Sequence, residues 1–252
     1  MTPHKILSNW MIEERERRVM GLKNKVVLIT GSTGELGRVV VETFVNASCQ
    51  VIGTYRNEKA YQELQKWLNT PSNLRGISVS LTDEDSVNQL FEEIRNRYGR
   101  LDALLHLAGG FWMGGTLWET PLAEWQRMMD MNMLTTFLCA RGAAEIMKSG
   151  GGGSIVLVSA AVARDLPAGM GSYAISKSAV LNLATILAKE GKPYHIRVNA
   201  ILPTIIDTAA NRRAMPDADV SQWIPPQKIA AVLSSLVAEE MDIVSGSAIQ
   251  LM

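Results

Sequence analysis

Cysteine, net charge and long apolar runs are all scarce in this chain of 252 residues. Its two cysteines, Cys49 and Cys139, lie inside apolar runs, so we expect buried, reduced thiols and no disulfide framework. Equal numbers of basic and acidic residues, 25 of each, argue against a protein that binds nucleic acid. No apolar run reaches the roughly 18 residues that span a bilayer. These absences predict a cytoplasmic protein that binds neither nucleic acid nor membrane.

Apolar residues make up 47% of the sequence, which is enough to bury the core of one α/β domain. We expect this domain over residues 25–252, with its substrate site built in. Residues 1–24 precede the first predicted strand and carry the charged run Glu13–Arg18. This run predicts a helical arm with a solvated face, or a contact between subunits.

A glycine-rich turn follows the first strong strand pattern. The apolar run from Val26 ends at Thr30, three glycines then recur at every third position, and an apolar helical pattern continues to Ala47. Glycine lets the backbone approach a pyrophosphate closely, and the start of the following helix offers unpaired N–H groups to the anion. The pattern therefore predicts a dinucleotide site, against the alternative of an ordinary strand-to-helix turn. The turn residues that we expect to bind the cofactor are Gly31, Thr33, Gly34, Glu35, Leu36 and Gly37.

An acidic residue is missing where the ribose of NAD(H) would need one. The second predicted strand, residues 50–55, ends in Tyr55 and is followed by Arg56, and no acid occurs between Thr43 and Asn57. A carboxylate there would accept from the ribose 2′-OH and repel a 2′-phosphate, whereas a guanidinium pairs with the phosphate. We therefore favour NADP(H), with Tyr55 and Arg56 in the site, and keep NAD(H) as the alternative. A solvated surface arginine is the competing interpretation of Arg56.

Strand and helix patterns alternate along the rest of the chain and predict a doubly wound parallel sheet. We expect strands over 76–80, 103–107 and 154–159, and helices over 58–68, from 82 and over 120–147. Apolar positions wrap most of the way round the longest helix, which predicts contact with both the sheet and another subunit of a homodimer or homotetramer. His106 lies in an apolar strand, so we interpret it as a core histidine. The glycine-rich loop 108–115 follows that strand and is expected to line the ligand crevice.

A tyrosine and a lysine at helical spacing carry the candidate chemistry. Tyr173 and Lys177 are four residues apart, so they share one face of a helix. A nearby ammonium stabilises a phenolate and lowers the phenol pKa from about 10 toward the working pH. The phenol can then pass a proton to a substrate as hydride arrives. An isolated pair of this kind is usually a surface feature, but the glycine turn upstream favours the catalytic interpretation.

These motifs together resemble the short-chain dehydrogenase/reductase family from Lys25 onward. The matching segments are TGSTGELG at 30–37, LAGG at 107–110, Asn132 in the long helix, YAISK at 173–177 and RVNAILPTIIDT at 197–208. The resemblance implies a three-layer (αβα) Rossmann fold in a single domain. It makes Tyr173 the proton donor, Lys177 the residue that holds the nicotinamide ribose, and Asn132 the anchor of a relay water. Further cofactor contacts implied by the resemblance are Ser80, Leu81, Ala108, Gly109, Pro203, Ile206 and Thr208.

The sequence departs from the family pattern at three positions. Ser80 stands where the family usually has an aspartate that holds adenine, and Glu35 replaces the middle glycine of the short form of the turn. Ala160 stands thirteen residues before the tyrosine, where the family has its catalytic serine. Ser159 is adjacent, but neighbouring side chains on a strand point to opposite faces, so it replaces that serine only if the strand is bulged or has ended. We keep Ser159 as a candidate catalytic residue.

A missing serine removes a donor to a developing oxyanion, which can cost several kcal/mol in carbonyl reduction. Segments 109–115, 202–223 and 245–250 are similar to quinonoid dihydropteridine reductase, a group that also has alanine at this position. We therefore predict an NADP(H)-dependent oxidoreductase that transfers hydride to a small carbonyl or quinonoid heterocyclic substrate, without a metal. The alternative is an NADP-binding regulatory or scaffold protein whose catalysis is impaired at this alanine. The residues expected at the substrate are Phe111, Trp112 and Met170.

Overall fold

The computed structural model describes residues 21–252, so the charged run Glu13–Arg18 of the predicted arm lies outside the described residues. Gly21 and Leu22 are helical and lead into the first strand. Leu22 is buried, and its carbonyl oxygen accepts a hydrogen bond from the Cys49 thiol at 3.2 Å. The chain therefore contributes to the core from Leu22 onward.

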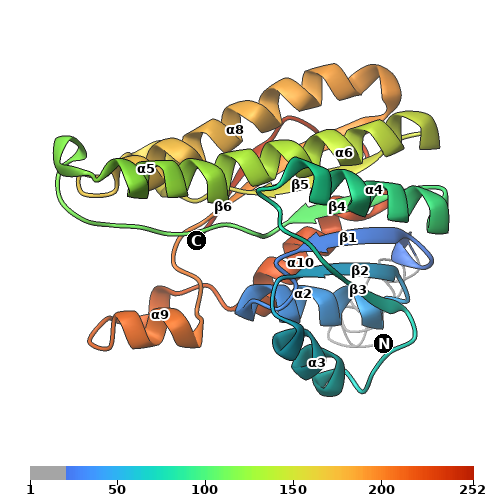
Figure 1. The fold of residues 1–252 in the computed structure, drawn as a ribbon, viewed down its shortest axis with the longest axis horizontal. Helices are drawn as coiled ribbons and strands as arrows, with labels where there is room; N and C mark the ends of the chain where they lie inside the picture. The colour runs from blue at the N-terminus through green and yellow to red at the C-terminus, as the bar shows by residue number, and fades with distance from the viewer. Residues whose placement is uncertain (1–20) are drawn as a thin grey trace, which may run out of the picture.

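Within residues 21–252, seven parallel strands form one sheet in the order β3-β2-β1-β4-β5-β6-β7 (Figure 1). The strands are β1 (Val26–Thr30), β2 (Gln50–Tyr55), β3 (Leu74–Ser78), β4 (Ala103–His106), β5 (Gly153–Val158), β6 (Ile196–Pro203) and β7 (Ala248–Leu251). The strand order reverses between β1 and β4, and in such sheets ligands bind at the carboxyl ends of the strands beside the reversal. The predicted doubly wound parallel sheet is confirmed.

Helices cover both faces of this sheet and complete three layers (Figure 1). One core lies between the sheet and α4 (Glu84–Tyr98), α6 (Thr135–Gly150) and α8 (Gly171–Gly191). The other lies between the sheet and α2 (Glu35–Asn46), α3 (Glu58–Trp67) and α10 (Pro226–Val237). The shorter helical segments are α5 (Leu122–Met128), α7 (Val162–Asp165), α9 (Ala209–Ala214), η1 (Leu117–Glu119), η2 (Met129–Leu134), η3 (Lys192–Tyr194), η4 (Val220–Gln222) and η5 (Glu239–Met241). In this described part of the chain, no helix combines the length and apolar character needed to cross a bilayer.

The long helix predicted over 120–147 changes its geometry near the middle. α5 continues without a break into the π-helical turn η2, and η2 passes directly into α6 at Thr135. A π-helical turn bonds each residue to the fifth one along, so it shifts the direction of the side chains that it carries, and such turns often occur at functional sites. The apolar period of the sequence predicts one helix here and missed this turn.

β3 lies two residues before the strand predicted over 76–80, so those predicted bounds are wrong. Asn73 fixes its start, because its side-chain amide donates to the carbonyl oxygens of Val45 and Cys49 at 3.0 and 2.9 Å. The strand then pairs with β2 until Ser78. Val79 and the residues after it leave the sheet at its carboxyl edge, where they are available to a ligand.

Both cysteines are buried and unpaired, Cys49 just ahead of β2 and Cys139 within α6. Burial raises the pKa of each thiol to about 12, so both stay protonated at neutral pH. The expectation of buried thiols without a disulfide is confirmed.

Candidate active site

The glycine turn connects β1 to α2 at the carboxyl edge of the sheet, and backbone contacts fix its shape. Gly31 has a φ of +67°, and a methyl group there would lie 3.2 Å from the backbone nitrogen of Ala108. A methyl group on Gly37 would lie 2.1 Å from the Gly31 carbonyl oxygen. Gly34 is the N-cap of α2 and has no side chain to occupy the open N–H groups of the first turn. The turn therefore leaves both space and donors for a phosphate group.

A cavity of about 390 Å³ opens in front of this turn, at the carboxyl ends of β1 to β4. Nine of its lining residues are predicted cofactor contacts, namely Gly31, Thr33, Gly34, Tyr55, Arg56, Ser80, Leu81, Ala108 and Gly109. The lining residues that were not predicted are Thr54, Asn57, Val79, Thr82, Leu107, Met131 and Thr135. Thr54, Asn57, Val79, Thr82 and Leu107 are each adjacent in the sequence to a predicted residue. Including the neighbours of each motif would therefore have found them. Met131 and Thr135 come from η2 and the start of α6, where no motif pointed to the cavity.

Arg56 is the one charged residue among the described residues that line the cavity. It directly follows β2, and its side chain is exposed. The neighbouring Tyr55 stacks on Tyr61 with ring centroids 4.5 Å apart, and its hydroxyl donates to the Glu58 carboxylate at 2.5 Å. A single cation at this end of the cavity favours an anionic group of the ligand.

His106 joins the two strands at the reversal of the sheet through hydrogen bonds. Thr30 Oγ1 accepts from the N–H groups of the two residues after His106, both at 3.1 Å, so its own proton goes to His106 Nδ1 at 3.1 Å. Thr135 Oγ1 donates to the Met131 carbonyl at 2.8 Å, so it accepts from His106 Nε2 at 3.3 Å. Burial, with a smaller effect from the charge of Lys177, lowers the His106 pKa to about 3 and keeps the ring neutral. The imidazole is a core group, as the sequence predicts.

Asn132 lies in the π-helical turn and holds the loop that follows β4. Its Oδ1 accepts from the Gly110 N–H at 2.9 Å, and its Nδ2 donates to the Gly110 carbonyl at 3.1 Å. Nδ2 also donates to Ser176 Oγ at 2.9 Å, and that hydroxyl donates to the Tyr173 carbonyl at 2.7 Å. The buried amide therefore connects this loop to the start of α8. Its role as the anchor of a relay water stays a prediction.

Tyr173 and Lys177 lie one turn apart near the start of α8. Lys177 Nζ donates to the Val158 carbonyl at 2.9 Å, and a methyl group on Gly109 would lie 3.1 Å from Nζ, so the amine reaches the end of the cavity. Burial raises the Tyr173 pKa to about 12 and lowers the Lys177 pKa to about 8. The predicted lowering of the phenol pKa is therefore wrong. Burial is the cause of the rise, and the Lys177 ammonium donates to the Val158 carbonyl.

Ser159, the candidate replacement for the family's catalytic serine, is hydrogen-bonded to the helix that carries Tyr173 and Lys177. β5 ends at Val158, so Ser159 has left the strand, which is one condition for the substitution. Its buried hydroxyl donates to the Lys177 carbonyl, within α8, at 2.8 Å. Ala160 carries no donor at all. The Ser159 hydroxyl is therefore already engaged in a hydrogen bond, and a catalytic role for Ser159 stays a prediction.

The loop after β4 brings an aromatic ring onto the candidate proton donor. Phe111 contacts Tyr173 edge to face, with ring centroids 5.0 Å apart and planes at 79°. The Gly114 N–H donates to the Gly169 carbonyl at 3.0 Å, which joins this loop to the segment before α8. The other predicted substrate residues lie in these joined segments, Trp112 in the first and Met170 in the second.

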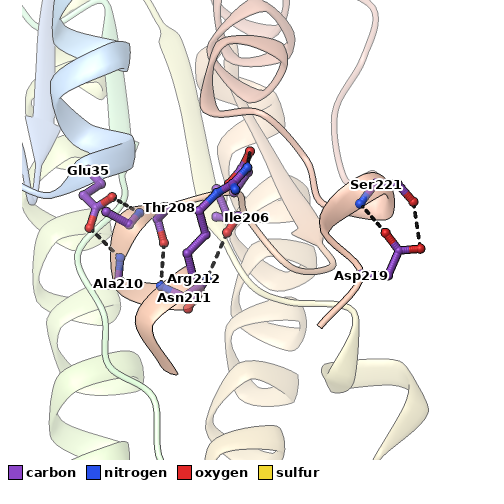
Figure 2. A network of polar contacts seen from close by, with 10 residues as sticks. Glu35, Ile206, Thr208, Ala210, Asn211, Arg212, Asp219 and Ser221 are labelled. Atoms are coloured by element: carbon purple, nitrogen blue, oxygen red, sulfur yellow. Dashed lines mark hydrogen bonds and ion pairs between the residues drawn. The ribbon is translucent and has the colours of Figure 1, made fainter. Parts of the chain in front are cut away.

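Apart from Tyr173 and Lys177, six predicted cofactor contacts lie outside the cavity lining, namely Glu35, Leu36, Gly37, Pro203, Ile206 and Thr208. Leu36 packs on the core beneath α2. Pro203 ends β6, and Ile206 forms an isolated parallel bridge with Ile224. Thr208 Oγ1 caps α9 by accepting from the Asn211 N–H at 3.2 Å, and Figure 2 shows Glu35 turned toward the same helix. Their contacts with a cofactor stay predictions.

A glycine turn at the reversal of a doubly wound sheet, with a Tyr–Lys pair beside its cavity, defines a dinucleotide-dependent oxidoreductase. Residues 25–219 match the family model described as short chain dehydrogenase, and the chain belongs to this family of nicotinamide-dependent enzymes.

Relatives of known activity cover nearly the whole chain. The 3-oxoacyl-acyl-carrier-protein reductase FabG of Salmonella typhimurium is 26% identical over 235 residues, which cover 90% of this chain and 95% of that protein. The 3alpha-hydroxysteroid dehydrogenase of Mediterraneibacter gnavus is 32% identical over 240 residues, again 90% of this chain and 95% of that protein. Among solved structures, ElxO with NADP bound has a TM-score of 0.85 and 25% identity, over 90% of this chain and 96% of that chain. The local resemblance to quinonoid dihydropteridine reductase is not shown by these relatives and stays a hypothesis about the substrate.

Proposed function

We propose that the protein is an NADP(H)-dependent oxidoreductase that transfers hydride to a small carbonyl or quinonoid heterocyclic substrate, with Tyr173 as the proton donor. One contact supports this function above all: the Lys177 amine lies against Gly109, a residue that lines the cavity, and on the same helical face as Tyr173. An acid–base pair is thereby adjacent to the cavity expected to hold the cofactor.

A bound nicotinamide cofactor supplies the hydride, and the side chains of the protein manage the proton. The raised pKa of Tyr173, about 12, keeps the phenol protonated at neutral pH, as a proton donor requires. The phenolate left behind needs a positive charge nearby, and Lys177, with a pKa of about 8, still carries one at neutral pH. Asn132 supports the pair by tying the loop after β4 to α8.

NADP(H) is favoured over NAD(H) because of the charge around the cavity. Arg56 is the one cation among the described lining residues, which include no carboxylate. A guanidinium pairs with the 2′-phosphate that distinguishes the two cofactors. The family relative ElxO, solved with NADP bound, agrees with this choice.

The substrate class follows from the alanine at the serine position. Ala160 offers no donor to an oxyanion, which favours an electron-poor quinonoid ring that receives its proton on nitrogen. Phe111, edge-on to Tyr173, adds an apolar surface on which a flat ring can pack. The carbonyl alternative is supported by two relatives whose names specify a 3-oxoacyl substrate and a hydroxysteroid.

Turnover of two probes tests this function. NADPH consumption is followed with a quinonoid dihydropterin and, separately, with acetoacetyl-coenzyme A as a 3-oxoacyl thioester. Tyr173→Phe should lower kcat by about 10²- to 10⁴-fold with whichever probe is reduced, because it removes the proton donor. Tyr98→Phe, at the end of α4, is the matched control and should leave kcat unchanged. An unimpaired Tyr173→Phe enzyme would remove Tyr173 from the mechanism.

A nucleotide-binding regulatory or scaffold protein is the second candidate, and Ala160 is the observation that favours it. In that case the protein binds NADPH tightly and reduces neither probe. Ala160→Ser should then gain reduction of acetoacetyl-coenzyme A, because it restores the missing donor. Turnover of either probe by the wild-type protein would exclude this candidate.

We further propose that the enzyme assembles as a homodimer or homotetramer through α6 and α8. A mostly apolar groove of about 420 Å³ runs between these helices, and Phe137 and Ile186 on its rim are 40% and 52% exposed. Apolar surface of this kind marks contact sites between chains. Ile186→Glu should lower the mass measured by light scattering to that of the monomer. An unchanged mass would contradict assembly through this face.

A further inference from the structure

Glu35 makes a long-range contact that no feature of the local sequence indicates. It is the residue that departs from the family's middle glycine, and it begins α2 directly after the cavity residue Gly34. Its carboxylate accepts from the backbone N–H groups of Ala209 and, at 2.9 Å, Ala210 (Figure 2). The glycine turn is thereby bonded to a segment 174 and 175 residues further along the chain.

The segment that Glu35 contacts is an excursion from the sheet, defined here as residues 207–223. It leaves the carboxyl end of β6 and carries α9, which lies beyond that edge of the sheet (Figure 1). Its base is closed by backbone hydrogen bonds, from the Asp207 N–H to the Ile224 carbonyl at 2.9 Å and from the Ile224 N–H to the Ile205 carbonyl at 2.8 Å. Beyond this base most of the excursion is exposed.

The other hydrogen bonds of the excursion join residues that are close in the sequence. Arg212 pairs with Asp207 at 2.6 and 2.9 Å, and Asp219 accepts from the Ser221 N–H at 2.9 Å (Figure 2). Asn211 Nδ2 also donates to the Ile206 carbonyl, at the base, at 2.8 Å. Among the hydrogen bonds of residues 21–252, the two to Glu35 are the ones that connect positions 208–222 to residues outside 205–224. The Glu35 carboxylate is therefore the hydrogen-bond link between the outer part of this segment and the glycine turn.

The charge of Glu35 makes this restraint relevant to the cofactor. α2 is the helix whose start is expected to receive the pyrophosphate, and an additional negative charge at that start weakens the binding of another anion. The two N–H groups from the excursion partly offset this charge. The contact thus has a cost for cofactor binding, which suggests that holding the excursion carries a benefit elsewhere.

We propose that Glu35 is a positioning residue that holds the 207–223 excursion against the glycine turn, so that the excursion forms one wall of the substrate cleft. The presence of a substrate in this cleft rests on the proposed function, whereas the contact between Glu35 and the excursion does not. Substrate affinity is then set partly by a residue of the cofactor-binding turn. Releasing the contact should loosen this wall without removing any group that takes part in the chemistry.

Hydrogen exchange in the ligand-free, full-length protein tests the contact itself. In Glu35→Ala, the amides of Ala209 and Ala210 should exchange about tenfold faster or more, because each loses a charge-assisted hydrogen bond. Glu35→Gln, which keeps one acceptor oxygen and the shape of the side chain, should give an intermediate rate. Asp219→Ala is the matched control: it removes a carboxylate that also accepts from backbone in the same excursion, and it should speed exchange at Ser221 only. Unchanged exchange at Ala209 and Ala210 in Glu35→Ala overturns the proposal.

Ligand binding tests the positioning role. For Glu35→Ala, the NADPH dissociation constant should fall about two- to fivefold, because a negative charge is removed from the start of α2. The KM for acetoacetyl-coenzyme A or the quinonoid dihydropterin should rise roughly threefold or more, with kcat changed less, since the closed wall is less populated. Opposite changes for cofactor and substrate are not expected from general destabilisation. If exchange accelerates while KM is unchanged, the positioning role is wrong; if neither probe is reduced, the proposed function fails and the exchange result still stands.

Discussion

The two regions that we propose as the cofactor side and the substrate side of the cleft are held in place by different kinds of contact. The cofactor side, the glycine turn with the ends of β1 to β4, is fixed by backbone packing, as where Gly37 lies against Gly31, and by the buried bonds around His106. The proposed substrate side, loop 111–118 and the 207–223 excursion, is joined to the body by bonds such as Gly114–Gly169 and the Glu35 contact. A side held by buried backbone tolerates little change, whereas a side held by isolated bonds on loops can move and vary.

The largest effect should come from breaking the cofactor side at its closest backbone contact. Gly37→Ala would place a methyl group 2.1 Å from a carbonyl oxygen that cannot retreat, so the free energy of unfolding should fall by about 3 kcal/mol or more, with loss of NADPH binding. Urea unfolding measures this. Gly150→Ala is the control, because a methyl group there meets nothing closer than Arg100 Cβ at 3.9 Å. Equal stability of the two variants would contradict a turn fixed by packing.

A smaller effect should follow from removing the charge of the cofactor side without touching its shape. Arg56→Ala should raise the NADPH dissociation constant about tenfold or more, since a charge-assisted pair with the 2′-phosphate is lost, and should leave NADH binding unchanged. Fluorescence titration with both cofactors gives the two constants. Arg95→Ala, exposed on α4, serves as the matched change of charge. Equal affinities of the wild-type protein for NADPH and NADH would contradict the preference for NADP(H).

Catalytic activity and the free energy of unfolding should respond to pH in opposite directions. Lys177 loses its proton as pH rises through about 8, so kcat/KM for reduction should fall roughly tenfold per pH unit above that value. Stability should change the other way: an unfolded lysine titrates near 10.5, so between about pH 8 and 10.5 the unfolded state binds more protons and the free energy of unfolding rises with pH. Lys177→Arg keeps the charge and should abolish the fall in activity. A flat activity profile across pH 8 would rule out a role for this charge.

The smallest effect is expected on the substrate side. Trp118 is 86% exposed in η1, so Trp118→Ser should change the free energy of unfolding by no more than about 0.5 kcal/mol. The same urea measurement applies. A loss of about 2 kcal/mol would show that this ring is packed in solution and that the substrate side is better held than its contacts indicate.

Local patterns were sufficient to predict nine of the residues that line the cavity. The turn from Gly31, the missing acid and Arg56 all depend on residue types within a few positions of a strand end, where backbone geometry determines what fits. The lining residues Met131 and Thr135 lay beyond such reasoning, because a π-helical turn has no signature in the apolar period. Glu35 lay beyond it for another reason: its partner is the backbone of a distant segment, which any residue type can supply.

The candidate chemistry was predictable in its residues but not in its energetics. Helical spacing was enough to pair Tyr173 with Lys177, whereas the directions of their pKa shifts depend on burial and on the carbonyl of Val158 that Lys177 binds. Ser159 illustrates the same limit. Its position at the strand end satisfied a local rule, yet the nearest acceptor, a carbonyl within α8, decided where its hydroxyl points.

The two buried thiols can serve as natural probes, one for each of the two helical layers. Cys49 belongs to the core under α2, α3 and α10, and Cys139 to the core under α4, α6 and α8. Neither thiol reacts while it is buried and protonated. The rate at which a disulfide reagent modifies each cysteine therefore reports how often its helical layer separates from the sheet. Two reaction rates from one sample thus report whether the layers open independently or as a unit.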